Sequence, residues 1–298
     1  MSPRFGSVIT AMVTPFDDRG DLDLTAAAEL ATWLVENGSD GLVLSGTTGE
    51  SPTLTESEEL VLFRTVREAV SVPILAGTGS NSTATAVEQT RHATEIGVDG
   101  ILLVTPYYNR PSQQGLFEHF KATAAATPLP VMVYDHPVRT GRKIDTDTIL
   151  RLADQVPNIV ALKDAAGDPT ETARLMARMP PGFEVYSGDD CLTLPLLSLG
   201  AVGAVSVASH WIGREIGQMI DAFAKGDVVE ARRINSLLVP SYDYESQLDA
   251  PNPVPTKALL RTLGLRVGEC RLPMGPTPAG LEDRARALLN DLKQNGSS

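Results

Sequence analysis

The chain has 298 residues, of which 42% are hydrophobic and 21% charged, and its formal net charge is −12. This length has room for one large α/β barrel or for two ordinary domains. The acidic balance and the lack of a long basic run exclude nucleic acid and anionic membrane surfaces as expected partners. The two cysteines, Cys191 and Cys270, form no close pairing motif, which predicts a reducing compartment without a disulfide framework.

No segment approaches the roughly 18 consecutive apolar residues that a membrane-spanning helix needs. Residues 1–20 include Arg4, Asp17 and Asp18 and lack an apolar signal core. The expectation is therefore a protein without a membrane span or a secretion signal, located in the cytoplasm. The last residues, 295–298, are small and polar and are expected to be frayed.

A unit of one strand followed by one helix recurs along most of the chain. Apolar segments at residues 41–44, 100–104 and 204–207 each follow an amphipathic helix and a loop that contains glycine. The predicted strands cover residues 7–12, 41–44, 73–76, 100–104, 130–134, 159–163, 184–187 and 204–207. The helices predicted between them cover residues 24–36, 82–96, 113–126, 145–155, 169–179 and 190–199, and a further helix opens at a capping box at residues 55–58.

Strands that alternate with helices pair in parallel through right-handed crossovers, and eight of them predict a closed (β/α)8 barrel, the TIM barrel. The rival is a doubly wound open sheet, but its dinucleotide fingerprint is missing because Ser82 stands where the third glycine would fall. After about residue 212 strand signals stop, and helices are predicted at residues 216–224, 228–238, 257–263 and 280–293. The predicted domains are thus a barrel over residues 1–224 and a small helical C-terminal domain over residues 225–298.

The predicted strand at residues 159–163 ends in a lysine, Lys163. A continuous apolar run of this kind is typical of a strand buried on both faces. Burial disfavours the charged lysine and lowers its pKa, and the neutral amine is a nucleophile that can form a Schiff base with a ketone. The alternative, which is the commoner one for such a stretch by itself, is a lysine that extends to solvent or pairs with a carboxylate.

Polar residues follow other predicted strands, where a barrel of this kind places its chemistry. The glycine-rich loop at residues 46–50 contains Thr47 and Thr48 and could hold a carboxylate or phosphate, or could be only a tight turn. Tyr134 ends an apolar strand and is either a general acid/base or a core tyrosine. Arg139 lies in a constrained loop, where its guanidinium could form two hydrogen bonds with a carboxylate or could simply be solvated.

Other polar residues are predicted to have structural roles. Asp164 adjoins Lys163 and so faces the opposite side of the strand, and Asp189 and Asp190 are expected to cap the next helix instead of binding a metal. The histidines show no metal-ligand spacing, and no Gly-x-Ser-x-Gly elbow is present. No metal site is therefore expected, and the coincidence of a buried lysine, a hydroxyl-rich loop, a tyrosine and an arginine favours Schiff-base chemistry on a small keto acid.

Several motifs, taken together and in order, resemble the dihydrodipicolinate synthase family, also called the 4-hydroxy-tetrahydrodipicolinate synthase family. The match runs from about residue 6 to residue 278, and its motifs lie at residues 46–50, 106–109, 134–141, 162–164, 186–190 and 252–257. The resemblance implies the barrel with a helical domain and the condensation of pyruvate with aspartate semialdehyde in the diaminopimelate–lysine pathway. It also implies a homotetramer built as a dimer of dimers, and no cofactor beyond the covalent Schiff base.

The resemblance also implies roles for individual residues. Lys163 would form the Schiff base with pyruvate. Thr47, Tyr134 and Tyr108 would form a proton relay, in which Tyr108 reaches into the neighbouring subunit's site. The residues implied in substrate binding are Thr48 and the Val205 backbone for the pyruvate carboxylate, Arg139 for the carboxylate of the semialdehyde, and Gly188.

Two positions depart from the pattern of family members that lysine inhibits. Glu56 stands where those members often have histidine, and Thr85 where they have glutamate, although Asn81 and Tyr107 do match. The departures argue against feedback inhibition by lysine. Two alternatives stay open at this point: a sister pyruvate aldolase, such as N-acetylneuraminate lyase or a 2-keto-3-deoxy sugar acid aldolase, and a barrel that binds a ligand without catalysis.

Overall fold

The computed structural model describes residues 3–295 and contains a closed eight-stranded barrel with the strand order β1-β2-β3-β4-β5-β6-β7-β8. Strand β1 pairs in parallel with β2, and the strands from β3 to β8 each pair in parallel with the next. The strands are β1 (Val8–Ala11), β2 (Gly41–Leu44), β3 (Ile74–Gly77), β4 (Gly100–Val104), β5 (Val131–Asp135), β6 (Ile159–Asp164), β7 (Glu184–Ser187) and β8 (Gly203–Ser206). The predicted (β/α)8 fold is confirmed, and the open doubly wound sheet is excluded.

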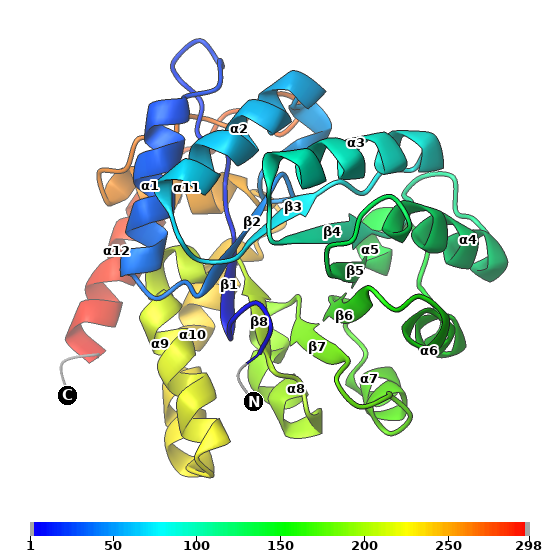
Figure 1. The fold of residues 1–298 in the computed structure, drawn as a ribbon. Coiled ribbons are helices and arrows are strands. Elements are labelled where there is room, and N and C mark those ends of the chain that lie inside the picture. The colour runs from blue at the N-terminus through cyan, green and yellow to red at the C-terminus, as the bar shows by residue number, and fades with distance from the viewer. Residues whose placement is uncertain (1–2, 296–298) are drawn as a thin grey trace. The chain divides into compact units, whose positions relative to one another are not determined.

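Helices follow the strands along the chain, as Figure 1 shows. They are α1 (Leu24–Glu36), α2 (Glu56–Ala69), α3 (Thr83–Ile96), α4 (Gln113–Ala124), α5 (Pro137–Thr140), α6 (Thr146–Gln155), α7 (Pro169–Met176), α8 (Thr193–Leu199), α9 (Ser209–Ala224), α10 (Val228–Glu245), α11 (Val254–Thr262) and α12 (Leu281–Asn295). Two short 3-10 helices, η1 (Ser51–Thr53) and η2 (Asp190–Leu192), complete the elements.

Local signals account for many of these boundaries. The predicted capping box is present at the start of α2. The side chains of Thr55 and Glu58 each accept a hydrogen bond from the backbone amide of the other residue. Gly97 and Gly200 end α3 and α8 with φ angles of 88° and 105°, a left-handed conformation that suits glycine. Asp189 accepts a hydrogen bond from the amide of Cys191, so its predicted capping role is confirmed.

The chain forms two compact units, and the first consists of the chain up to Ser7 together with Pro73–Val205. Within it, β4, β5 and β6 are consecutive parallel strands that are buried on both faces. Helices α3, α4, α6, α7 and α8 are neighbours in that order, each beside the next (Figure 1). This arrangement brings the carboxyl ends of β4 to β7 to one edge of the sheet, where Val104, Tyr134, Lys163 and Tyr186 are in register.

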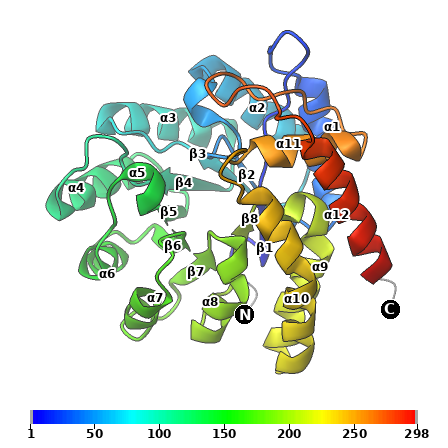
Figure 2. The same ribbon diagram turned by 180° about the vertical axis from the view of Figure 1, so that it is seen from behind.

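The second unit consists of Val8–Val72 together with the chain from Ser206 onward. In it α9 packs on α10, and α11 packs on α12, as Figure 2 shows from behind. Apolar residues of α10, α11, α12 and their connections form one cluster, which includes Tyr244, Leu259 and Leu281. The predicted domain boundary at residues 224 and 225 falls between α9 and α10 and stays a prediction.

Two helices of this unit, α9 and α10, extend well beyond their predicted bounds. α9 begins at Ser209, seven residues before the predicted start, and it is kinked at Ile212. α10 continues through Pro240 to Glu245, although the prediction ended the helix before that proline. The buried face on both sides of Pro240, which includes Leu238 and Tyr242, packs within the unit and sustains the helix across the proline. The indole nitrogen of Trp211 in α9 donates to Ser241 of α10 at 3.0 Å.

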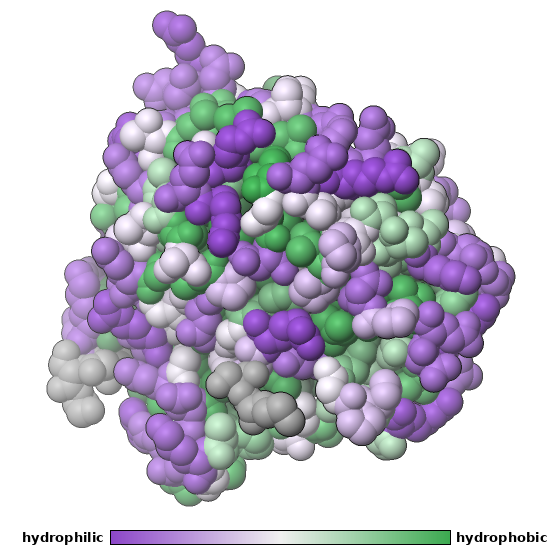
Figure 3. All heavy atoms as spheres, in the orientation of Figure 1, coloured by the Kyte–Doolittle hydropathy of each residue, from purple (hydrophilic) through white to green (hydrophobic). Residues whose placement is uncertain are grey.

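Hydrophilic and hydrophobic residues are interspersed over the face drawn in Figure 3. No helix among the described residues is both long and apolar enough to span a membrane. The predicted fraying of residues 295–298 lies almost wholly outside the described residues.

Candidate active site

Six of the predicted site residues belong to the first unit and lie at or just beyond the carboxyl ends of its strands. Because these strands are parallel and adjacent, their carboxyl ends share one edge of the sheet. Val205 is buried near the end of β8, one position beyond the paired residues of β7 and β8. The six residues are Tyr108, Tyr134, Arg139, Lys163, Gly188 and Val205.

Lys163 and Tyr134 are direct neighbours on β6 and β5. The lysine Nζ lies 4.3 Å from the centroid of the tyrosine ring. Lys163 is 6% exposed and Tyr134 5%, so the lysine is held inside the protein but is not completely closed off from solvent. The lysine therefore does not extend into bulk solvent, and an amine and a phenol share one buried site. Lowering of the Lys163 pKa stays a prediction.

Gly188, just after β7, leaves the space that the lysine side chain occupies. A Cβ at this position would lie 2.9 Å from Cγ and 3.0 Å from Cε of Lys163, and 2.9 Å from Cβ of Ala165. The backbone amide of Gly188 also donates to the carbonyl oxygen of Asp164 at 2.7 Å. Only glycine allows this close approach of the β7 end to the lysine.

The backbone of Tyr134 is held by a residue that sequence reasoning did not single out. Thr105, which follows β4 and is fully buried, donates to the Tyr134 carbonyl oxygen from its amide at 2.9 Å and from its hydroxyl at 3.0 Å. A threonine directly after an apolar strand was the available signal. The two bonds fix the end of β5 against the end of β4.

The segment after β5 carries Arg139 in the short helix α5. This helix was not predicted, but it begins at Pro137, whose fixed φ angle suits a first helical position, and it ends at Gly141 with a φ angle of 72°. Arg139 is exposed. The neighbouring His136 ring lies 5.9 Å from the Tyr134 ring, and burial, with the charges of Arg139 and Lys163, lowers its pKa to about 4. His136 is therefore uncharged at neutral pH.

Tyr108 lies in an exposed loop after β4. Its side chain is 89% exposed, and its φ angle of 72° is unusual for a residue other than glycine. Its amide donates to the carbonyl oxygen of Thr140 at 3.3 Å, which connects this loop to the Arg139 segment. Nearby, the side-chain amide of Asn109 donates to the carbonyl oxygen of Asn81 at 2.8 Å.

The other two predicted residues, Thr47 and Thr48, belong to the second unit and follow β2. Thr47 is half-buried and Thr48 is buried. The side-chain amide of Asn252 donates to the Thr48 hydroxyl oxygen at 3.0 Å, across 204 residues of sequence. Sequence reasoning recognised the motif at residues 252–257 but did not connect Asn252 with Thr48.

A closed (β/α)8 barrel with a buried lysine at a strand end, beside the tyrosine of the adjacent strand, is the arrangement of a (β/α)8 lyase. The family model described as "Dihydrodipicolinate synthetase family" matches residues 4–293, so the chain belongs to this family.

Individual relatives agree with the family model. The chain is 50% identical to a 4-hydroxy-tetrahydrodipicolinate synthase of Thermosynechococcus vestitus over 97% of both proteins. Among solved structures, dihydrodipicolinate synthase from Bacillus anthracis has a TM-score of 0.93 and 46% identity, with 97% of this chain and 99% of that chain covered. The lysine-bound synthase from Cyanidioschyzon merolae has a TM-score of 0.94 and 48% identity, with 97% and 98% covered. The sister aldolases considered from sequence are not favoured.

Proposed function

We propose that this protein condenses pyruvate with L-aspartate 4-semialdehyde to 4-hydroxy-tetrahydrodipicolinate, in lysine synthesis through diaminopimelate, with Lys163 as the Schiff-base residue. The observation that carries the proposal is the buried Lys163 amine 4.3 Å from the Tyr134 ring, in a chain that belongs to the dihydrodipicolinate synthetase family. The sequence relatives named as 4-hydroxy-tetrahydrodipicolinate synthases support the choice of substrates.

The chemistry follows from the amine and the phenol. The Lys163 nitrogen attacks the keto carbon of pyruvate, and loss of water leaves an imine. The imine draws electrons from the adjacent methyl group, so that a base can remove one of its protons and leave a nucleophilic carbon. That carbon attacks the aldehyde of the second substrate, whose oxygen takes up a proton. The amino group of that substrate then attacks the imine carbon and displaces the Lys163 nitrogen, which closes the ring and frees the lysine. Tyr134 transfers the protons, and Thr47 and Tyr108 extend the relay.

Two groups of residues bind the carboxylates in this proposal. Thr48 and the Val205 backbone hold the pyruvate carboxylate, and Gly188 keeps open the space around the lysine. The hydrogen bond from Asn252 supports the assignment of Thr48, because an amide that donates to the hydroxyl oxygen leaves the hydroxyl hydrogen free to donate elsewhere. Arg139 receives the semialdehyde's carboxylate, and its exposed guanidinium can form two parallel hydrogen bonds with it.

The protein assembles as a homotetramer, a dimer of dimers, in which Tyr108 contributes to the neighbouring subunit's site. Support comes from the exposed aromatic pair Tyr107 and Tyr108, which is unfavourable in water and is stabilised when a second copy covers it. The cytoplasmic location and the absence of lysine inhibition stay predictions.

Borohydride trapping tests the proposal. Reduction in the presence of pyruvate should leave a covalent adduct on Lys163, located by peptide mass spectrometry, and the protein should condense pyruvate with aspartate semialdehyde. Lys163→Ala should lose the adduct and reduce kcat by about a thousandfold or more. Lys225→Ala, at an exposed lysine that pairs with Asp221, is the control and should behave as wild type. An adduct on another lysine, or faster cleavage of sialic acid or a keto-deoxy sugar acid, would contradict the proposal.

A further inference from the structure

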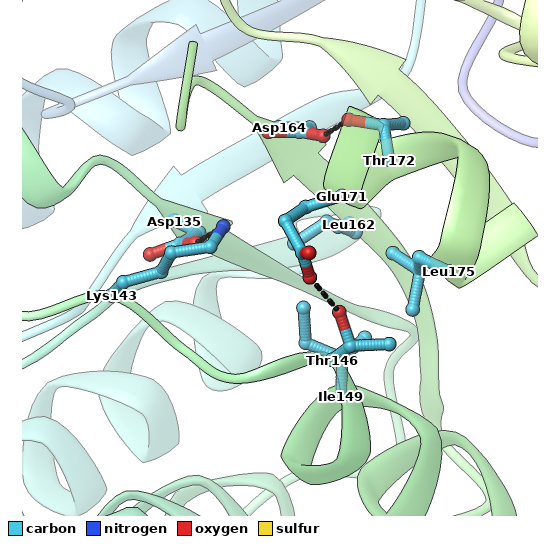
Figure 4. A pocket seen from close by; sticks show the side chains of 9 residues that line it. All are labelled: Asp135, Lys143, Thr146, Ile149, Leu162, Asp164, Glu171, Thr172 and Leu175. Atoms are coloured by element: carbon cyan, nitrogen blue, oxygen red, sulfur yellow. Dashed lines mark hydrogen bonds and ion pairs between the residues drawn. The ribbon is translucent and has the colours of Figure 1, made fainter. Parts of the chain in front are cut away.

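A second polar cluster lies behind the lysine and the tyrosine, on the other side of the same two strands. Asp135 and Asp164 directly follow Tyr134 and Lys163 and pair with each other in register. Because side chains alternate along a strand, both carboxylates point away from the amine and the phenol. Figure 4 shows them on the side of the strands that faces Thr146 of α6 and Thr172 of α7. Both are buried, and Asp135 is only 1% exposed.

Asp164 has a local structural role, as the sequence predicted. One of its oxygens accepts from the hydroxyl of Thr172 at 2.6 Å, and the other accepts from the amide of Ala166 at 3.0 Å. These bonds fix the turn between β6 and α7. Asp164 therefore needs no further partner.

Asp135 instead binds residues from beyond the Arg139 segment. Its Oδ1 accepts from the amide of Ile144 at 3.2 Å, and its Oδ2 accepts from the ammonium of Lys143 at 3.4 Å. The donors are nine and eight positions further along the chain, so the carboxylate closes the intervening segment onto the end of β5. Arg139 lies in the middle of that closed segment.

Gln113 of α4 holds the other end of this segment, at Lys143 and Asp145. The side-chain amide of Gln113 donates to the carbonyl oxygen of Lys143 at 2.9 Å, and its oxygen accepts from the amide of Asp145 at 3.0 Å. Inside the segment, the Thr140 hydroxyl lies within hydrogen-bond distance of the carbonyl oxygens of His136 and Arg142, which flank α5, and can donate to either. The segment is thus held by hydrogen bonds at both ends, and the Asp135 carboxylate fixes it to the end of β5.

The space beside Asp135 is too small for a ligand. It is a cavity of about 10 Å³, enough for one water molecule at most. It is lined by Asp135, Lys143, Thr146, Ile149, Leu162, Asp164, Glu171, Thr172 and Leu175, which Figure 4 shows. The polar cluster therefore holds parts of the protein together and does not bind a ligand.

Three charged groups face Asp135 across this cluster: Lys143 before α6, Asp164 on β6 and Glu171 on α7. Burial raises the pKa of Asp135 to about 6, and the negative charge of Asp164 raises it too, whereas the cation of Lys143 lowers it. The Glu171 carboxylate accepts a hydrogen bond from the Thr146 hydroxyl and forms an ion pair with Arg174. Asp135 is thus ionised above about pH 6 and protonated below it, and the protonated acid no longer attracts Lys143.

We propose that Asp135 is a positioning residue for Arg139: its ionised carboxylate closes the Arg139 segment onto β5 and so sets the affinity for the second, carboxylate-bearing substrate, without acting on the pyruvate step. The inference rests on the proposed function. Protonation of Asp135 weakens its contact with Lys143 and loosens the Arg139 segment. KM for aspartate semialdehyde therefore rises as pH falls through about 6 and is lowest above it. Pyruvate binding at Lys163 does not follow this change.

The first measurement uses the wild-type protein. KM for aspartate semialdehyde is determined between about pH 5 and pH 8, alongside the pyruvate concentration that gives half-maximal borohydride adduct. We expect KM to rise about fivefold or more between pH 7 and pH 5, with an apparent pKa near 6, while the trapping concentration shows no matching change. A KM without this rise would overturn the inference.

The second measurement uses Asp135→Asn, which keeps an oxygen to accept from Ile144 but loses the charge that holds Lys143. We expect KM for aspartate semialdehyde to be about tenfold higher at neutral pH and no longer to rise below pH 6, with trapping at an unchanged pyruvate concentration. Asp147→Asn, at an exposed carboxylate of α6 that pairs with Arg178, makes the same change of charge and should resemble wild type. Equal losses for both substrates would show a general structural role and would overturn the inference.

Lys143→Met supplies an independent test if Asp135→Asn does not fold. Without Lys143 the ionised Asp135 carboxylate has no cation to hold, so KM for aspartate semialdehyde should already be raised at neutral pH and should rise less below pH 6. A pH profile like that of the wild type would assign the pH dependence to another group and overturn the inference. Failure of the proposed function is a separate result: the wild type would then lack the Lys163 adduct or the condensation activity.

Discussion

Gly188 is the residue at which one added methyl group should have the largest effect on the chemistry. The lysine chain passes so close to it that a Cβ would meet Cγ and Cε of Lys163 at 2.9 and 3.0 Å. These distances are too short for ordinary contacts, and Ala165 blocks a third direction at 2.9 Å. The lysine side chain is the group that can move, and a nucleophile that moves by about 1 Å can lose about a hundredfold in rate.

We therefore expect Gly188→Ala to lower kcat by about tenfold to a hundredfold and to slow borohydride trapping by pyruvate, with a far smaller effect on thermal stability. Steady-state kinetics and the rate of adduct formation check this. Gly217→Ala in α9 is the matched control, because its Cβ would find Val8 at an ordinary 3.7 Å. A normal rate in Gly188→Ala would show that the lysine tolerates displacement.

At the scale of elements, a buried ion pair joins the loop after β2 to α11. Lys257 Nζ lies 2.7 Å from Glu50 Oε1, and both side chains are 1% exposed. Glu50 has a left-handed φ angle of 57°, and its other oxygen accepts from the amide of Arg271 at 2.9 Å. The Lys257 ammonium also lies 4.1 Å from the centroid of the Phe16 ring. The loop that carries Thr47 and Thr48 is thus held from behind by the C-terminal helices of its own unit.

Lys257→Met should lower the free energy of unfolding by about 3–5 kcal/mol, because it leaves the Glu50 carboxylate buried without its cation. Thermal or denaturant unfolding measures the loss. The double variant Lys257→Met with Glu50→Gln should recover much of it, since no charge is then left without a partner. Lys225→Met, at an exposed pair, should change stability by less than about 0.5 kcal/mol. A loss in the double variant as large as in the single one would contradict this account.

At the scale of the whole molecule, the proposed assembly makes a prediction of its own. If Tyr108 acts in the neighbouring subunit's site, two inactive variants should restore each other. Mixing Lys163→Ala with Tyr108→Phe under conditions that exchange subunits should recover activity, because a mixed pair has one site with both groups intact. Light scattering should show a tetramer for each variant. Mixtures that stay inactive although subunits exchange would place Tyr108 outside the partner's site.

The elements of this fold were largely predictable because their signals are local. Strands buried on both faces are continuous apolar runs, and the predicted strands at residues 100–104 and 184–187 agree with β4 and β7. Helix α1 was predicted with its observed ends, because periodicity and caps act over a few residues. The position of Lys163 at the end of a buried strand followed from the same pattern. The exceptions are α5, which was not predicted, α9, which begins earlier than predicted, and α10, which tertiary packing carries past Pro240.

The sequence by itself determined the barrel, the strand ends that carry the lysine and the tyrosine, and the family. Only the tertiary structure decided what surrounds them: the close approach of Gly188 to the Lys163 side chain, the hydrogen bond from Ile144 to Asp135, and the hydrogen bond from Asn252 to Thr48. The physical reason is range. Propensity, periodicity and capping act between near neighbours in the chain, whereas these contacts join residues that only packing brings together.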